Sequence, residues 1–377
     1  MTWTCPACTL LNPNEAMVCE ACEGPGPGAS AFATTGAVVC KGCHQPIRRG
    51  AGMLQALGRS YHPECFRCGA CQRVFEANTR FQVHEDEPYH AACFQELFHP
   101  RCDVCSELLP MNTSQHIVYR EMPFWRLKYC GIHDQRARCC SCKRIEPTAS
   151  HRRFESLSDG RKLCPGCAET VILDTSEVQP VVAHVWSFLA SLGMHLPALP
   201  VLLVDFETLN AHTHDHHANL PRDAMAPAIY GVCLSEVRYI RHIAHRGATE
   251  RMQLGDRRVN AILILHGLPY DMTAHILAHE ATHAYFKLHP EFPSHLSPQV
   301  EEGVCQLLAY LYLEFMNVTN APGNYRATLR GCYVYHLLHD PSPIYGDGLR
   351  AALAAYNRHN SLQAVLDHVR ANTLETI

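Results

Sequence analysis

The sequence contains no apolar run that approaches the roughly 20 residues of a membrane-spanning helix. Residues 1–12 lack the basic start and apolar middle of a secretory signal. Positive charge is scarce at the same end, since residues 1–40 contain no Lys or Arg, and the whole chain has a formal net charge of -4. We therefore expect a cytoplasmic protein, with the nucleus as a second location, that binds neither nucleic acid nor membranes.

Cysteine is abundant by comparison, with 21 residues in a chain of 377. Eighteen of them precede residue 170, many in Cys-x-x-Cys pairs. A chain without a secretory signal is expected to keep its thiols reduced. Metal binding therefore explains the pattern better than disulfide bonds do.

These cysteines and three histidines divide by spacing into five sets of four zinc ligands. The first set belongs to a small finger, the next two have the spacing of a LIM domain, and the last two form a divergent LIM-like unit. The sets are Cys5, Cys8, Cys19 and Cys22; Cys40, Cys43, His62 and Cys65; Cys68, Cys71, His90 and Cys93; Cys102, Cys105, Cys130 and His133; and Cys139, Cys142, Cys164 and Cys167. Cys140, Cys233, Cys305 and Cys332 are left over, and we interpret them as ordinary buried thiols.

The finger resembles the Ran-binding-protein (NZF) type, including Trp3, Thr9 and Asn12. Members of that class bind either ubiquitin or single-stranded RNA. RNA binding requires cations, which this segment lacks, so the resemblance favours ubiquitin, with Thr9 and Leu10 as the contact. Ala21 departs from the large apolar residue that ubiquitin-binding members carry there, and a structural role or another partner stays open.

A different metal motif lies at residues 277–288. His279 and His283 are four residues apart, so both rings share one face of a helix and reach one ion. Glu280 adjoins the first histidine. This pattern is typical of zinc peptidases, in which the ion polarises a water and the neighbouring carboxylate takes its proton.

A third ligand is expected from a helix that begins near Ser297 and Pro298, an N-cap and a first helical residue. Helical periodicity leaves Glu301 and Glu302 open. Eighteen residues separate His283 from Glu302, and Gly303 follows it. This spacing resembles the gluzincin class of zinc peptidases, and the resemblance selects Glu302.

The fold class that we expect is α+β, with small zinc-stapled modules followed by a gluzincin-like metallopeptidase domain. The predicted domains are a finger at 1–30, a linker at 31–38, a LIM domain at 39–98, a LIM-like zinc domain at 99–172 and the peptidase domain at 173–377. Residues 181–192 have helical periodicity and residues 201–204 read as a buried strand. Residues 259–265 predict a second strand, which forms either the cleft edge that pairs with substrate or an interior core strand.

Four histidines crowd a loop rich in Asp, Asn and Pro, and we interpret the stretch as solvated in preference to metal-binding. They are His212, His214, His216 and His217.

Beyond the linker, the chain resembles the plant DA family of LIM-containing, ubiquitin-activated zinc peptidases that limit organ growth. The matching segments are Cys139-Cys140-Ser141-Cys142 and residues 159–164, 201–204, 263–269, 276–283, 300–306 and 345–348. Family members carry ubiquitin-interacting helices near their N-terminus, where this chain has the finger. If the finger binds ubiquitin, it supplies the same function as those helices by a different module.

The motifs and the resemblance together predict a ubiquitin-linked zinc metallopeptidase that cleaves protein substrates. His279, His283 and Glu302 are the expected ligands of one catalytic zinc beside about five structural ones. Glu280 is the expected general base, and Tyr345 or His336 the donor to the oxyanion. Two alternatives are a non-catalytic LIM scaffold for ubiquitylated partners and a gluzincin aminopeptidase.

Titration of labelled ubiquitin against residues 1–30 by NMR tests the finger. We expect weak binding, because a finger of this size buries little surface, and loss of binding when Thr9 and Leu10 are both changed to Ala. The four thiolates are untouched in that variant, so it should still fold. An absence of shift perturbation at millimolar ubiquitin would remove the finger from the mechanism.

Overall fold

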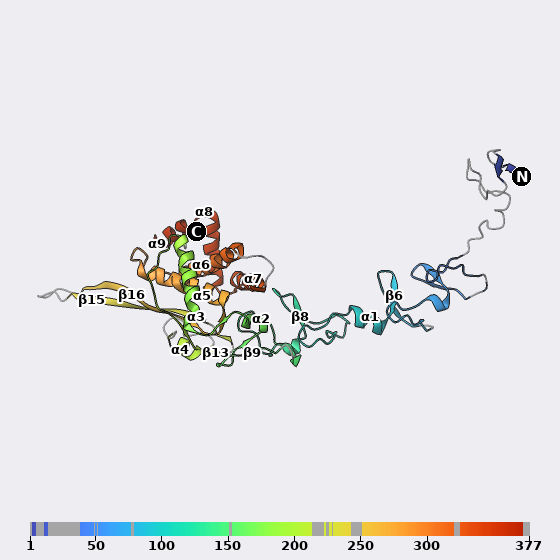
Figure 1. Cartoon of the computed structure of the whole chain (residues 1–377), viewed down its shortest axis with the longest axis horizontal. Coiled ribbons are helices and arrows are strands. Elements are labelled where there is room, and N and C mark those ends of the chain that lie inside the picture. Colours follow the sequence, from blue (N-terminus) through green and yellow to red (C-terminus); the bar gives the residue numbers. More distant parts are fainter. Residues whose placement is uncertain are drawn as a thin grey trace. The chain divides into compact units, whose positions relative to one another are not determined.

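The computed structural model describes residues 2–4, 11–13, 38–48, 50, 52–76, 79–150, 153–212, 222–223, 226–227, 229–242, 251–319 and 325–371. The chain forms two compact units, Met1–Pro100 and Arg101–Ile377. Each is described by itself (Figure 1). No helix within the described ranges is long and apolar enough to cross a membrane.

The first unit contains short antiparallel ribbons. β1 (Thr2–Thr4) pairs with β2 (Leu11–Pro13), whereas the finger's cysteines and the Thr9 and Leu10 contact lie outside the described residues. The LIM domain contains β3 (Leu54–Ala56), β4 (Arg59–Tyr61), β5 (Phe81–His84), β6 (Glu87–His90) and α1 (Ala91–Phe98).

Both predicted LIM ligand sets converge in this unit. The backbone N–H groups of His62 and His90 donate to Cys40 Sγ at 3.3 Å and to Cys68 Sγ at 3.5 Å. Phe66, one of the two residues between the sets, is 3% exposed, and its ring centroid lies 5.0 Å from that of Tyr61. The packing of these aromatic rings therefore helps to hold together the two zinc sites that the ligand spacing predicts.

The second unit begins with the LIM-like module. Its elements are β7 (Arg120–Met122), β8 (Leu127–Tyr129), β9 (Glu155–Ser156), β10 (Lys162–Leu163), α2 (Pro165–Ala168) and β11 (Val171–Ile172). β11 pairs with β17 (Leu268–Pro269), and the thiols of the last zinc set belong to the same hydrophobic core as the later helices. The boundary predicted at residue 173 therefore falls inside one compact unit.

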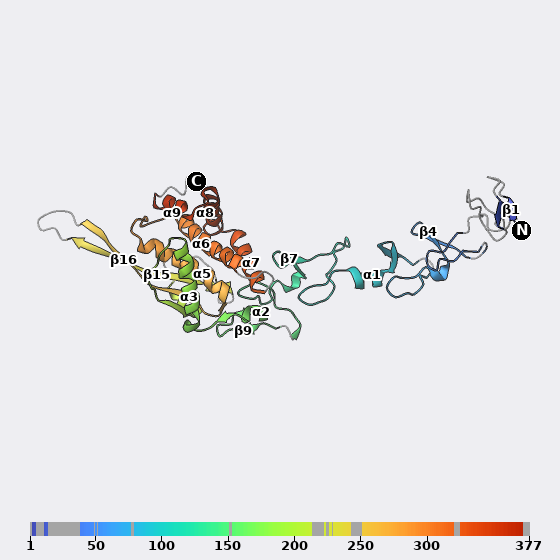
Figure 2. The ribbon, with the colours of Figure 1, turned by 45° about the horizontal axis from the view of Figure 1, so that its top comes forward.

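The rest of the second unit contains a three-stranded sheet. The order is β12 (Val201–Val204), β16 (Arg251–Leu265), β15 (Gly231–His242), with β12 and β16 parallel and β15 and β16 antiparallel. The strand predicted at 259–265 is confirmed as part of β16. It is the middle strand of the sheet, between β12 and β15, and β15 is an edge strand that contacts α5. The far ends of β15 and β16 project beyond the helices (Figures 1 and 2).

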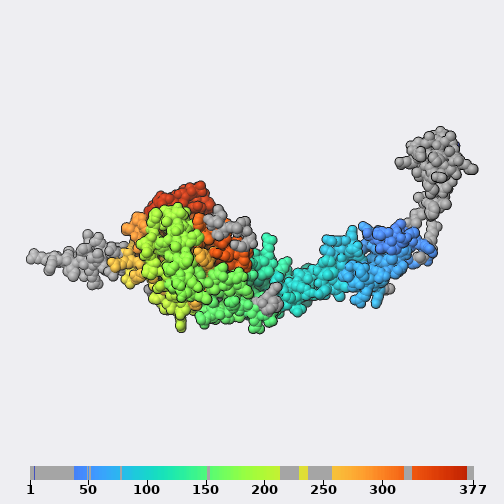
Figure 3. All heavy atoms as spheres, in the orientation of Figure 1, coloured from blue at the N-terminus to red at the C-terminus, as the bar shows by residue number. Residues whose placement is uncertain are grey.

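Helices pack on this sheet and on one another. They are α3 (Thr175–Ser191), α4 (Phe206–Ala211), α5 (Tyr270–Leu288), α6 (Pro298–Thr319), α7 (Tyr325–Leu338), α8 (Gly346–His359) and α9 (Leu362–Arg370). The predicted helix at 181–192 is confirmed as part of α3, which Asp174 caps. Figure 3 shows α3, in yellow-green, on the surface of the unit beside the green LIM-like module. The loop histidines are absent from the described residues except His212, which ends α4.

Two glycines allow α6 and α8 to touch. A Cβ atom at Gly303 would lie 2.5 Å from the carbonyl carbon of Gly348, and one at Gly348 would lie 2.5 Å from the Gln299 carbonyl oxygen. Any larger residue would push the helices apart. This contact brings the start of α8 to the start of α6, which carries the predicted third ligand.

Candidate metal centre

Helix α5 points two histidine rings at one place. The Nε2 atoms of His279 and His283 lie 3.2 Å apart. The helix is buried along most of its length and packs on β15, β16 and α6. Burial against so many elements fixes the direction of both rings, as a metal site requires.

Glu302 completes a set of three atoms. Its Oε2 lies 3.0 Å from His279 Nε2 and 3.4 Å from His283 Nε2. This oxygen is buried and has no hydrogen-bond partner. Burial alone would raise the pKa of Glu302, but the two histidines lower it well below its ordinary value. A buried anionic oxygen that faces two ring nitrogens fits a shared cation, and the donor set of two imidazoles and one carboxylate fits zinc.

Glu301 takes the other side of the same histidine. Its Oε1 accepts a hydrogen bond from His283 Nδ1 at 2.8 Å. Metal-binding histidines commonly donate their second ring N–H to a carboxylate, which fixes the tautomer and the ring orientation. The two adjacent glutamates, which helical periodicity did not separate, therefore occupy different positions around the site.

Cys305 is a competing neighbour. Its Sγ and one nitrogen each of His279 and His283 lie within 4.8 Å of one another, so these three side chains could also hold an ion. The thiol is fully buried, which raises its pKa to about 12 and favours the neutral form. Glu302 Oε2, by contrast, belongs to a carboxylate whose pKa is lowered, and it lies 3.0 and 3.4 Å from the two Nε2 atoms. We therefore assign the third position to Glu302.

Glu280 lies beside the three atoms, buried at 7% exposure. Burial raises the pKa of its carboxyl group. The first residue of β15 is fitted to this side chain, because a Cβ atom at Gly231 would lie 2.8 Å from Glu280 Cγ and 3.0 Å from Oε1. Only glycine lets the edge strand approach the carboxylate this closely.

Tyr345 and His336 occupy different surroundings. Tyr345 directly precedes α8, whose Gly348 contacts Gly303 beside Glu302, and burial together with the charges of Glu302 and Glu280 raises the pKa of its hydroxyl group. His336 lies on α7 and lines a cavity of about 150 Å³ with Phe124, Trp125 and Lys143 of the LIM-like module. The structure thus brings Tyr345 toward the three-atom set and turns His336 toward the module.

The structural ligand sets also converge where they are described. The four sets between Cys40 and Cys167 each gather their ligand atoms within 4.8 Å. His133 Nε2 is buried without a hydrogen-bond partner, which fits a ligand atom. The described residues therefore fit four structural zinc ions and one ion at the three-atom site. The ligands of the finger lie outside the described residues.

Small zinc modules followed by an α+β domain with a buried His-His-Glu set describe a class of LIM-containing proteins with a further candidate metal centre. Family models agree, matching "DA1-like: Protein DA1" over residues 192–372, a LIM domain over 40–98 and "Zn-finger in Ran binding protein and others" over 2–28.

Curated relatives extend these matches over most of the chain. Protein DA1-related 2 of Arabidopsis thaliana is 36% identical over 88% of this chain and 68% of its own length. LIM domain-containing protein HDR3 of Oryza sativa subsp. japonica is 34% identical over 91% and 75%, and Protein DA1 of Arabidopsis thaliana is 34% identical over 88% and 67%. The chain belongs to the DA1-like family.

Exchange of each glutamate for glutamine tests which one holds the ion. E302Q removes the charge of the oxygen that faces both Nε2 atoms, and the variant should lose one zinc per chain after dialysis, measured by elemental analysis. E301Q removes only the partner of His283 Nδ1, so zinc should remain bound with about 10–100-fold weaker affinity. Zinc loss from E301Q alone would reverse the assignment.

Proposed function

We propose that this chain is a zinc metallopeptidase that cleaves protein substrates. The observation that carries the proposal is the approach of His279 Nε2, His283 Nε2 and Glu302 Oε2 to within 3.0–3.4 Å of one another. Three protein ligands leave a fourth position open, as in catalytic zinc sites. A buried carboxylate next to that position supplies the base.

The reaction divides among named side chains. A bound zinc ion would polarise the scissile carbonyl group and make a water acidic. The Glu280 carboxylate takes the proton of the attacking water and passes it to the leaving amine nitrogen. Burial raises the pKa of Glu280, which makes its carboxylate a stronger acceptor for the proton of the water. The Tyr345 hydroxyl group donates to the developing oxyanion.

The edge strand offers a place for the substrate. In the described part of the chain, β15 pairs only with β16, so its other edge has no strand partner, and the Cys233 carbonyl oxygen accepts from Lys287 Nζ at 3.5 Å. An extended peptide that adds to this edge is held by main-chain hydrogen bonds, which tolerate many sequences. The interior position of β16 moves the predicted substrate edge from residues 259–265 to the start of β15.

The aminopeptidase and the non-catalytic scaffold account for these residues less completely than a protein-cleaving peptidase does. An aminopeptidase needs a carboxylate for the free amine of its substrate, whereas Glu280, Glu301 and Glu302 each have another role here. A scaffold needs no buried general base, yet Gly231 is fitted to Glu280 at a distance that other residues would not permit. Both observations support a peptidase that acts within protein chains.

Ubiquitin provides the expected link to substrates. The Ran-binding-protein type finger matched at residues 2–28 supports recruitment of ubiquitin or ubiquitylated proteins through Thr9 and Leu10. The LIM and LIM-like modules add surfaces for partner proteins. A weak finger is sufficient, because attachment to the same chain raises the local concentration of a tethered substrate. We place this activity in the cytoplasm, with the nucleus as a second location.

Changing Glu280 to Gln separates metal binding from chemistry. The variant keeps the size of the side chain and all three ligands, so zinc content should equal that of the wild type. Cleavage of a protein substrate should fall about 10²- to 10⁴-fold, the usual contribution of a general base.

The matched control is Glu207→Gln on α4, an exposed carboxylate that should leave cleavage unchanged. Retained cleavage by E280Q at full zinc content would assign the activity to another site.

A further inference from the structure

The last zinc set begins with a Cys-x-x-Cys knuckle, and we call residues 139–144 the knuckle. Its cysteines belong to the same hydrophobic core as the apolar residues of α5 and α6. Three of its side chains each contact a tyrosine that lies far along the chain. Ser141 Oγ lies 2.7 Å from Tyr333 Oη, Lys143 Nζ lies 2.7 Å from Tyr230 Oη, and Arg144 bonds to Tyr325. Tyr325 and Tyr333 lie on α7 and Tyr230 directly precedes β15, so the knuckle makes polar contacts to two separate parts of the unit.

Both partners of the Lys143–Tyr230 hydrogen bond make a second hydrogen bond. Lys143 Nζ donates to the Cys140 carbonyl oxygen at 3.0 Å as well as to Tyr230. The Tyr230 carbonyl oxygen in turn accepts from the Leu265 N–H at 2.8 Å, which ties the residue to β16. Tyr230 is therefore fixed by its side chain to the knuckle and by its backbone to the sheet.

The next residue is the one that touches Glu280. A Cβ atom at Gly231 would lie 2.8 Å from Glu280 Cγ, so the backbone here forms one wall of the space around the carboxylate. Any movement of Tyr230 changes this wall directly. Lys143 is thus one residue and one hydrogen bond away from the general base.

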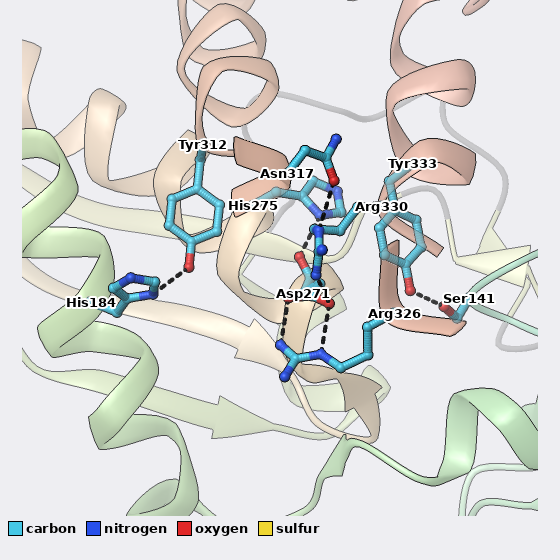
Figure 4. A network of polar contacts seen from close by, with 9 residues as sticks. All are labelled: Ser141, His184, Asp271, His275, Tyr312, Asn317, Arg326, Arg330 and Tyr333. Atoms are coloured by element: carbon cyan, nitrogen blue, oxygen red, sulfur yellow. Dashed lines mark hydrogen bonds and ion pairs between the residues drawn. The ribbon is translucent and has the colours of Figure 1, made fainter. Parts of the chain in front are cut away.

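A second contact reaches the same helix from α7, as Figure 4 shows. The ring of Tyr333, held by Ser141, has its centroid 5.2 Å from that of His275, which precedes His279 by one turn of α5. Arg326 and Arg330, also on α7, bind Asp271 in the first turn of α5 at 2.7 and 3.3 Å. The knuckle therefore contacts α7 through Ser141, and α7 in turn packs on α5.

We propose that Lys143 and Tyr230 are positioning residues for the general base. Through these two residues the knuckle sets the geometry of the peptidase site. The inference rests on the proposed function. Lys143 fixes Tyr230, Tyr230 fixes the start of β15, and Gly231 keeps the Glu280 carboxylate in place. The Ser141–Tyr333 contact supports the arrangement from α7. Peptidase activity then depends on the integrity of a zinc module that supplies none of the three atoms of the candidate metal centre.

The test uses Lys143→Met and Tyr230→Phe, which remove the two partners of one hydrogen bond and preserve side-chain size. In the full zinc-loaded chain, each should lower kcat about tenfold with little change in KM, the effect of losing one charged hydrogen bond. The double variant should match the single ones, because both remove the same contact. Lys162→Met is the matched control, since Lys162 pairs with Glu146 inside the module at 3.2 Å and should leave kcat unchanged.

Hydrogen exchange measured by mass spectrometry provides a readout that needs no activity. K143M and Y230F should speed amide exchange in residues 229–236 and 275–283 at unchanged zinc content, whereas K162M should not. Unchanged exchange in those segments, or unchanged kcat of K143M beside an active wild type, overturns the inference. A wild type that cleaves nothing overturns the proposed function instead, and exchange alone then decides whether the knuckle positions Glu280.

Discussion

The buried Oε2 atom of Glu302 places the strongest constraint on this structure. An unpaired anionic oxygen in a protein interior is costly unless a cation or a donor compensates it. Here it faces two ring nitrogens at 3.0 and 3.4 Å, so a zinc ion would offset the cost for all three groups. Helices α5 and α6 must consequently pack in one relative position. The ion and the packing of the two helices stabilise each other, as in other sites where metal binding is coupled to folding.

Several sequence features gain a physical reason from this constraint. Gly303 and Gly348 permit the contact between α6 and α8, which carries Tyr345 toward Glu302. Glu301 fixes the ring of His283, and Gly231 leaves room for Glu280. The Glu-Gly pair at 302–303 and the Tyr-Gly-Asp-Gly segment at 345–348 therefore belong to one packing arrangement, although more than forty positions separate them in the sequence.

Local spacing predicted the parts of the site that lie close together in the chain. His279 and His283 follow from helical geometry, and the structural zinc sets follow from paired cysteines. Helical periodicity did not distinguish Glu301 from Glu302, because adjacent residues both lie near the boundary of the buried face. An apolar run likewise did not show that β16 is interior and β15 is the edge. The Lys143–Tyr230 hydrogen bond joins residues 87 positions apart, so no local sequence pattern could indicate it. The sequence also did not show that His336 faces the LIM-like module, because that depends on the tertiary packing of α7.

The central claim is that the three-atom site supports hydrolysis of protein substrates. The direct measurement is incubation of the zinc-loaded chain with ubiquitylated and unmodified forms of the same candidate protein, followed by mass spectrometry of the products. We expect new fragments with defined termini, formed faster from the ubiquitylated form and abolished when zinc is removed by a chelator. Intact substrate in both forms at full zinc occupancy, or cleavage that persists after the zinc is removed, would contradict it.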